Sequence, residues 1–163
     1  MRLPKPTVVF VVGHERWGKS YTLSALKQIC GSRRKDWYIT IKGIRFRVRT
    51  ASNDDFPEPY EKFILSFSGD YLIAALCPKF LKLKNYNRRQ KTIEVSLRSL
   101  QRRRYRLAFW VIKHRWSDPT RFICQEEISE LHKYGKVEVF KGIKVKDRQR
   151  AKVFRRFVLR HSA

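Results

Sequence analysis

The sequence contains no apolar run long enough to cross a bilayer. Its longest wholly apolar stretches, such as Val8 to Val12 and Leu107 to Ile112, reach about a quarter of the roughly 20 residues that a spanning helix needs. The first residues also lack the long apolar segment and small-residue cleavage site of a secretory signal. We therefore expect a cytoplasmic protein without a membrane span.

Cysteine is sparse and scattered. The chain has Cys30, Cys77 and Cys124, an odd number, and none lies in a Cys-x-x-Cys or Cys/His cluster with metal-ligand spacing. This pattern argues against a disulfide scaffold and against a zinc site. We expect three reduced core thiols.

Acidic residues are scarce as well. The chain has 14 Asp and Glu against 38 Lys and Arg, which gives a formal net charge of +24. Solubility of a small domain does not require so large an excess, so the charge indicates a polyanionic partner. DNA or RNA fits best, because neutralisation of phosphates by Lys and Arg supplies most of the non-specific affinity for nucleic acid. A membrane surface, or a host with generally basic proteins, is the alternative.

The length and apolar content predict one folded domain over residues 1–163. A chain of 163 residues can close a single core but is too short for a nucleotide-binding domain plus an independent second one. Although 32% of residues are charged, 42% are hydrophobic, which is enough apolar area to offset the chain entropy lost on folding.

Hydrophobic periodicity predicts strands that alternate with helices. We expect strands at residues 7–12, 44–49, 71–76, 107–112 and 137–140, and residues 37–42 are a candidate to pair beside the second of them. Helices are expected at 19–29, 57–67, 93–106, 125–134 and 147–159. This order predicts an α/β fold, a three-layer sandwich with a mainly parallel sheet of about five strands.

A glycine-rich segment lies between the first expected strand and the first expected helix. Residues 13–20 read Gly-His-Glu-Arg-Trp-Gly-Lys-Ser and satisfy the complete Walker A pattern. In this pattern, backbone N–H groups surround phosphate oxygens, the lysine reaches the β and γ phosphates, and the serine hydroxyl binds Mg²⁺. We therefore expect nucleoside triphosphate binding by Gly13, His14, Glu15, Arg16, Trp17, Gly18, Lys19, Ser20 and Tyr21, with Lys19 also catalytic and Ser20 also a metal ligand.

Through Gly13, Gly18, Lys19 and Ser20 the chain resembles the P-loop NTPase superfamily. The resemblance implies the α/β sandwich expected above, with Mg²⁺ and a nucleoside triphosphate as cofactors. The edge-like strand at 44–49 is similar to the arrangement in nucleotide-kinase-like members. Only the glycine-rich segment is specific, and we identify no closer family.

Two features depart from the superfamily pattern. A carboxylate beside a triphosphate is repulsive, so we expect Glu15 to point away; alternatively, Glu15 or His14 orients a water or an acceptor. No Asp ends either of the strands at 71–76 and 107–112, where the usual metal-binding acid stands. Asp54 and Asp55, which follow the strand at 44–49, are the candidate catalytic and metal-binding acids. The alternative for both is a turn or helix cap.

Two further features concern the nucleotide and its phosphates. No Asn-Lys-x-Asp guanine motif follows the strand at 107–112, which favours ATP over GTP. Arg115 and Arg121 follow that strand, where similar enzymes place a lid or an arginine that stabilises the transferring phosphate. Ordinary surface positions are the alternative for both arginines.

Arginines are concentrated on the expected helix at 93–106. Arg98, Arg102 and Arg106 have i, i+4, i+8 spacing, and no acid in the middle of the helix neutralises them. We expect a nucleic-acid interface, with a solvated helix face as the alternative. Its residues are Arg88, Arg89, Arg98, Arg102, Arg103, Arg104 and Arg106.

Together these features favour an ATP-binding P-loop NTPase, an ATPase associated with DNA or RNA. The alternative is a small nucleotide-kinase-like phosphotransferase that moves the γ phosphate of ATP to a nucleotide or another small acceptor. A third hypothesis is a non-hydrolysing subunit of a larger protein assembly, in which the nucleotide only orders the fold.

Overall fold

The computed structural model describes residues 5–115 and 118–162, and its centre is a six-stranded sheet in the order β2-β3-β4-β1-β5-β8. Strand β2 is antiparallel to β3, and every other neighbouring pair is parallel. The prediction of an α/β fold with a mainly parallel sheet is confirmed. The strands are β1 (Thr7–Val12), β2 (Tyr38–Ile41), β3 (Ile44–Arg49), β4 (Tyr71–Leu76), β5 (Arg106–Ile112) and β8 (Lys136–Phe140).

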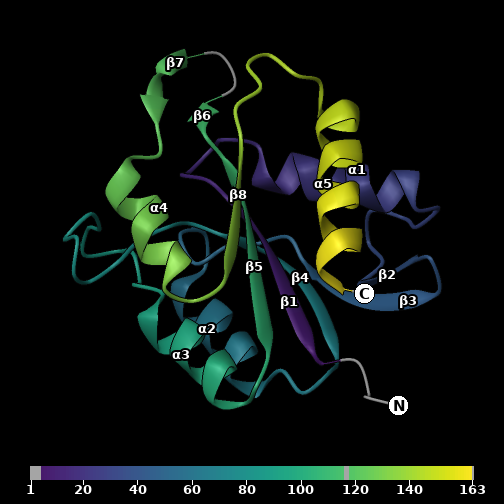
Figure 1. The fold of residues 1–163 in the computed structure, drawn as a ribbon, viewed down its shortest axis with the longest axis horizontal. Helices are drawn as coiled ribbons and strands as arrows, with labels where there is room; N and C mark the ends of the chain where they lie inside the picture. Colours follow the sequence, from purple (N-terminus) through teal and green to yellow (C-terminus); the bar gives the residue numbers. More distant parts are fainter. Residues whose placement is uncertain (1–4, 116–117, 163) are drawn as a thin grey trace.

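Helices cover both faces of the sheet (Figure 1). Helices α1 (Lys19–Ile29) and α5 (Asp147–Ser162) pack on one face, and α2 (Pro57–Ser66), α3 (Glu94–Arg102) and α4 (Gln125–His132) pack on the other. Strand β1 supplies both cores, because Val9 and Val11 face α1 and α5 while Val8, Phe10 and Val12 face the other helices. This double burial explains why β1 is apolar at nearly every position.

The sheet has six strands, whereas the sequence predicted about five and a candidate strand at residues 37–42. The candidate segment 37–42 contains β2, which joins β3 through a two-residue turn at Lys42 and Gly43. Both turn residues have positive φ, 46° and 79°, as the common tight hairpin turn requires. The hairpin places β2 at the sheet edge.

Helix α3 ends four residues earlier than predicted. Arg104 adopts a left-handed conformation with φ of 65°, and the N–H of Tyr105 donates to the carbonyl of Leu100 at 3.1 Å. A second bond from the Arg104 N–H to Gln101 completes a Schellman motif, which glycine usually provides. Because an arginine occupies that position, the sequence hides the helix end.

A small hairpin after β5 was not predicted. Strands β6 (His114–Arg115) and β7 (Asp118–Phe122) form a separate two-stranded antiparallel sheet. The sequence suggested only a loop here, since β6 is too short to show periodicity. The hairpin carries both Arg115 and Arg121.

The structure also bears on two expectations from the sequence, which concern a membrane span and the cysteines. Across residues 5–115 and 118–162, no helix combines the length and the apolar character that crossing a membrane demands. Cys30, Cys77 and Cys124 are free thiols, of which Cys77 is buried and the other two are half-buried.

Arg103 follows α3 directly and fastens α2 to it. Its guanidinium donates to the carbonyl of Ile64 at 2.7 Å and, in a very short contact, to the carbonyl of Phe67. These carbonyls lie at the C-terminal end of α2, where the last backbone acceptors lack the usual i+4 donor, and the Ile64 carbonyl also accepts a long 3.4 Å bond from the Phe67 N–H.

Replacing Arg103 with Gln should therefore lower the free energy of unfolding by about 2 kcal/mol, since the lost hydrogen bonds involve a charged donor. The exposed Arg98 on α3 is the matched control, and Arg98→Gln should change stability by less than about 0.5 kcal/mol. Urea unfolding followed by circular dichroism measures both. Equal effects of the two substitutions would contradict the assigned role.

Candidate functional site

The segment Gly13–Ser20, called the glycine loop below, connects the end of β1 to the start of α1. The N–H of Gly13 donates to the Leu76 carbonyl of β4 at 3.1 Å, and the N–H of Trp17 turns back to the His14 carbonyl at 3.3 Å. The Trp17 side chain is buried in the core below, at 5% exposure. The loop is therefore anchored at its beginning and at its middle.

The loop presents a concentration of free backbone N–H groups. In the described chain, no acceptor lies within hydrogen-bonding reach of the N–H groups of Glu15, Arg16, Gly18, Lys19 and Ser20. Arg16 and Gly18 have positive φ, 61° and 91°, which turns consecutive amides in different directions. Such an array at a helix N-terminus suits an anion, because the amides and the helix dipole both favour negative charge.

Arg150 of α5 supports the loop from behind. Its Nη2 donates to the Gly18 carbonyl at 3.1 Å, and its Nε donates to Thr22 Oγ1 of α1 at 2.7 Å. A side chain at residue 18 would collide with this guanidinium, so the position requires glycine for space as well as for its positive φ. Burial lowers the pKa of Arg150, and Asp147 opposes that effect.

Sequence reasoning missed Arg150. A signal was present, because the residue shares the inward face of α5 with Ala151, Phe154 and Phe157. An arginine on an apolar face needs a partner, but the sequence did not indicate which one.

Lys19 lies at the mouth of the loop. Its Nζ donates to the carbonyls of Gly13 at 2.6 Å and His14 at 2.8 Å, and it lies 3.8 Å from Asp54 Oδ2. The residue is 6% exposed. Its ammonium group is thus held between the carbonyls of the glycine loop and Asp54.

Asp54 is the acid that faces Lys19. Its side chain is 2% exposed, and its Oδ1 is buried without a hydrogen-bond partner among the described residues. Burial raises the pKa of Asp54, and the nearby Lys19 opposes that rise, while the charges of Asp55 and Glu15 add to it. A buried carboxylate oxygen without a partner is costly unless a ligand supplies one.

Asp55 differs from Asp54. Its Oδ2 accepts a hydrogen bond from the N–H of Ser52 at 3.0 Å. This contact favours the turn alternative for Asp55 rather than the predicted catalytic and metal-binding role. Both acids line a cavity of about 220 Å³ with Glu15, Lys19 and Ser20.

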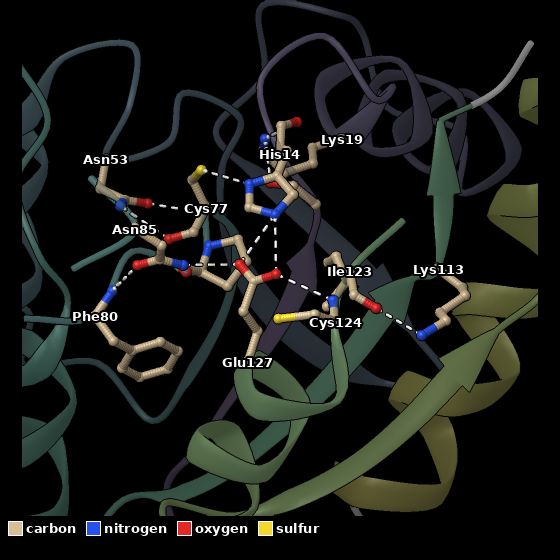
Figure 2. A network of polar contacts seen from close by, with 12 residues as sticks. His14, Lys19, Asn53, Cys77, Phe80, Asn85, Lys113, Ile123, Cys124 and Glu127 are labelled. Atoms are coloured by element: carbon tan, nitrogen blue, oxygen red, sulfur yellow. Dashed lines mark hydrogen bonds and ion pairs between the residues drawn. The ribbon is translucent and has the colours of Figure 1, made fainter. Parts of the chain in front are cut away.

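Asn53 holds this acidic segment against the end of β4. Its side chain accepts from the Cys77 N–H at 2.7 Å and donates to the Cys77 carbonyl at 3.0 Å (Figure 2). The amide is buried, so both bonds form away from water. Asn53 thereby places Asp54 across from the glycine loop, a contact that no local sequence pattern indicates because Cys77 lies 24 residues away.

The His14 ring does not face the amide array. Figure 2 shows it between Cys77 and Glu127, with Nε2 at 3.0 Å from Glu127 Oε2 and Nδ1 at 3.8 Å from the Cys77 sulfur. Glu127 also accepts from the N–H of Cys124 and from Asn85. The side chain of His14 therefore joins the glycine loop to α4, and the role expected of this residue at the phosphates or at a reacting water stays a prediction.

The remaining predicted site residues lie around the loop. Ser20 and Tyr21 are exposed, and the Ser20 hydroxyl donates to the Thr50 carbonyl at 3.2 Å. Arg115 and Arg121 line a cavity of about 570 Å³ together with Arg16 and Lys79. The structure thus brings both predicted lid arginines to the glycine loop. Arg121 also lies 3.7 Å from Asp118.

The predicted arginine interface changes in two respects. Arg106 begins β5 rather than continuing α3, so the i, i+4, i+8 row is wrong at its last member. Arg103 is engaged with α2, whereas Arg98, Arg102 and Arg104 are exposed, as are Arg88 and Arg89 in the preceding loop. Arg106 pairs with Thr7 at the start of β1, so the end of α3 lies beside the N-terminal ends of these strands. The glycine loop follows the C-terminal end of β1, at the opposite end of the sheet.

Comparison with known proteins yields no match: no protein-family model, curated protein or solved structure matches the chain. Among the residues that the structure describes, no three His, Cys, Asp or Glu side chains cluster as a preformed metal centre would require. Mg²⁺ in nucleotide sites commonly takes only one or two carboxylates and completes its shell with phosphates and water.

The Glu127 contacts predict a dependence of stability on acid. Burial by itself raises the pKa of Glu127, but the hydrogen bond and charge of His14, with the Cys124 N–H, bring it below its ordinary value of 4.5. A lowered acid pKa in the folded state adds stability above the unfolded-state pKa, and this contribution disappears as the pH falls through the folded-state pKa.

The unfolding free energy of the wild type should therefore exceed that of Glu127→Gln at pH 7, and the difference should shrink below a pH of about 4.5. Urea unfolding of both proteins from pH 7 down to a pH of about 3 measures the difference across this range. The exposed Glu126→Gln is a control from the same helix turn. A difference that stays constant with pH would contradict the assigned ion pair.

Proposed function

We propose that this chain is an ATP-binding P-loop NTPase that hydrolyses ATP in association with DNA or RNA. The observation that carries the proposal is Asp54: a buried acid with an unpartnered oxygen, 3.8 Å from Lys19 at the mouth of the glycine loop. Structural stability alone does not account for such an acid, since its environment raises its pKa. A cationic ligand between Asp54 and a phosphate accounts for it directly.

The residues present fit a bound Mg²⁺ ion. Asp54 offers its free oxygen, Ser20 offers a hydroxyl from the first turn of α1, and both line the same cavity. Carboxylate and hydroxyl oxygens are suitable ligands for this cation. When bound, Mg²⁺ neutralises charge on the β and γ phosphates.

The glycine loop supplies the phosphate contacts in this proposal. Lys19 is held by loop carbonyls and by Asp54, and it can turn its ammonium to phosphate oxygens because the proposed Mg²⁺ would take its place beside Asp54. The free N–H groups of the loop complete the anion site. Glu15, exposed at the rim, is available to orient water.

A second pocket has room for the rest of the nucleotide. It has a volume of about 400 Å³ and is lined by Tyr21, Gly18 and Arg150, among others. The Tyr21 ring is 69% exposed and offers an aromatic face. Together with the absent guanine motif, this supports ATP as the nucleotide.

Phosphotransfer to a small acceptor is the second candidate. It is favoured by the cavity of about 570 Å³, where Arg16, Lys79 and Arg115 offer positive charge beside the glycine loop. Release of ADP only in the presence of a nucleotide or nucleoside acceptor would identify this activity. Tight ATP binding without turnover in either assay would instead support the NTP-gated subunit of a larger assembly.

Asp54→Asn should keep ATP binding in EDTA, lose the gain in affinity that Mg²⁺ provides, and lower kcat at least about 100-fold. The substitution should also raise the melting temperature of the nucleotide-free protein. Because the folded state raises the pKa of Asp54, its ionised form weakens the fold at pH 7, and asparagine removes that charge.

Asp55→Asn is the matched control, since Asp55 is bonded to Ser52 and should affect kcat less than about threefold. Isothermal titration with ATP and ATPγS, steady-state ADP release and thermal unfolding make up the experiment. If Asp54→Asn and wild type turn over ATP equally, Asp54 is not the metal-binding acid. If wild type does not bind ATP, the proposal fails.

A further inference from the structure

The outer face of the β2–β3 hairpin carries a row of arginines. Arg45, Arg47 and Arg49 alternate along β3 with Phe46 and Val48, which are buried in the core shared with α1 and α5. The three arginines therefore project from the opposite face of the sheet, the face on which α2 packs.

Aromatic rings alternate with these arginines in space. The Arg45 guanidinium lies 4.0 Å from the Tyr38 ring centre, and the Arg47 guanidinium lies 4.5 Å from that of Trp37. Arg49 lies 4.9 Å from the ring centre of Phe63 on α2. Trp37 and Tyr38 remain 66% and 45% exposed, so their rings still offer surface to a partner.

The charges of this row are not neutralised. Among the described residues, none of the three arginines has a carboxylate within ion-pair distance, and Arg49 Nε is buried without a hydrogen-bond partner. Burial lowers the pKa of Arg47, Tyr38 opposes this, and the like charge of Arg49 adds to it. Asp70 is the acidic residue in the lining of the adjoining groove, whose volume is about 670 Å³.

We propose that this arginine–aromatic surface, made of Trp37, Tyr38, Arg45, Arg47, Arg49 and Phe63, binds single-stranded nucleic acid. Arginine supplies phosphate contacts, and exposed rings supply planes on which unpaired bases stack. Successive arginines on one strand face are about 7 Å apart, close to the axial rise of about two stacked nucleotides. A duplex hides its base faces and uses only the charge, so the rings select a single strand.

The surface leads towards the nucleotide site. Arg49 is followed by Thr50, whose carbonyl accepts the Ser20 hydroxyl of the glycine loop, and by the segment that carries Asp54. A strand bound along β3 therefore ends near the proposed ATP site. The inference rests on the nucleic-acid part of the proposed function, and it replaces the α3 arginines as the main contact.

The experiment measures binding of a fluorescein-labelled oligothymidylate of about 16 nucleotides, and of a duplex of equal length, by anisotropy at several salt concentrations. The double variant Arg45→Gln, Arg47→Gln should bind the single strand about tenfold more weakly, and the slope of log affinity against log salt should fall by about 1.4. Trp37→Ala should also lose about tenfold, while Trp37→Phe should stay near wild type.

The double variant Arg98→Gln, Arg102→Gln is the matched control, because it removes the same charge from an exposed face of α3. It should lose less than about threefold. Circular dichroism and thermal unfolding establish that all variants fold.

The outcomes separate the two proposals. If wild type binds the oligonucleotide but both double variants lose affinity equally, the inference is overturned and the nucleic-acid part of the proposed function survives. A preference for duplex, or no effect of Trp37→Ala, also overturns it. If wild type binds no nucleic acid, that part of the proposed function falls with the inference, whereas ATP binding is judged by its own assay.

Discussion

The site depends on one electrostatic constraint, the burial of a lysine and an aspartate that do not fully satisfy each other. At 3.8 Å, Lys19 and Asp54 attract, but the carboxylate keeps an oxygen without a partner. An uncompensated charge of this kind destabilises a fold, so the surrounding structure must hold it in place. Asn53 does this on the acidic side through the backbone of Cys77, and the anchored glycine loop does it on the other side.

The elements around this pair converge because the strands are parallel. The carboxyl ends of β1, β3, β4 and β5 all lie at the same end of the sheet. This brings together the segments that follow them, namely the glycine loop, Asp54, Cys77 and the β6–β7 hairpin. Glu127, in the first turn of α4, links that helix to the glycine loop through His14 and to the segment before α3 through Asn85 (Figure 2). Movement of the loop on binding a phosphate would therefore reach α4 and the basic segment before α3 through direct contacts.

The sequence predicted the parts of the fold that depend on local pattern. The bounds of β1, β4 and α1 follow from apolar runs and helical spacing, and the glycine loop follows from its motif. It failed where unusual residues take special conformations, as Arg104 does at the end of α3. It could not find the contacts of Asp54, Asn53 and Arg150, because their partners lie far along the chain and only the folded sheet brings them near. Without the contact to Lys19, Asp54 could not be told from Asp55, which bonds to the nearby Ser52.

The contact between Arg150 and the glycine loop has a consequence for biosynthesis. Arg150 lies 132 positions beyond Gly18 and 128 beyond Thr22, so the support for this early segment is synthesised long after the segment itself. Strand β1 lies between β4 and β5, so its backbone pairing cannot be completed until both of these later strands have been synthesised. Such long sequence separations slow folding, and the glycine loop does not gain this support until α5 has docked. The conformation of an early segment of the chain is thus completed by a contact that forms late in folding.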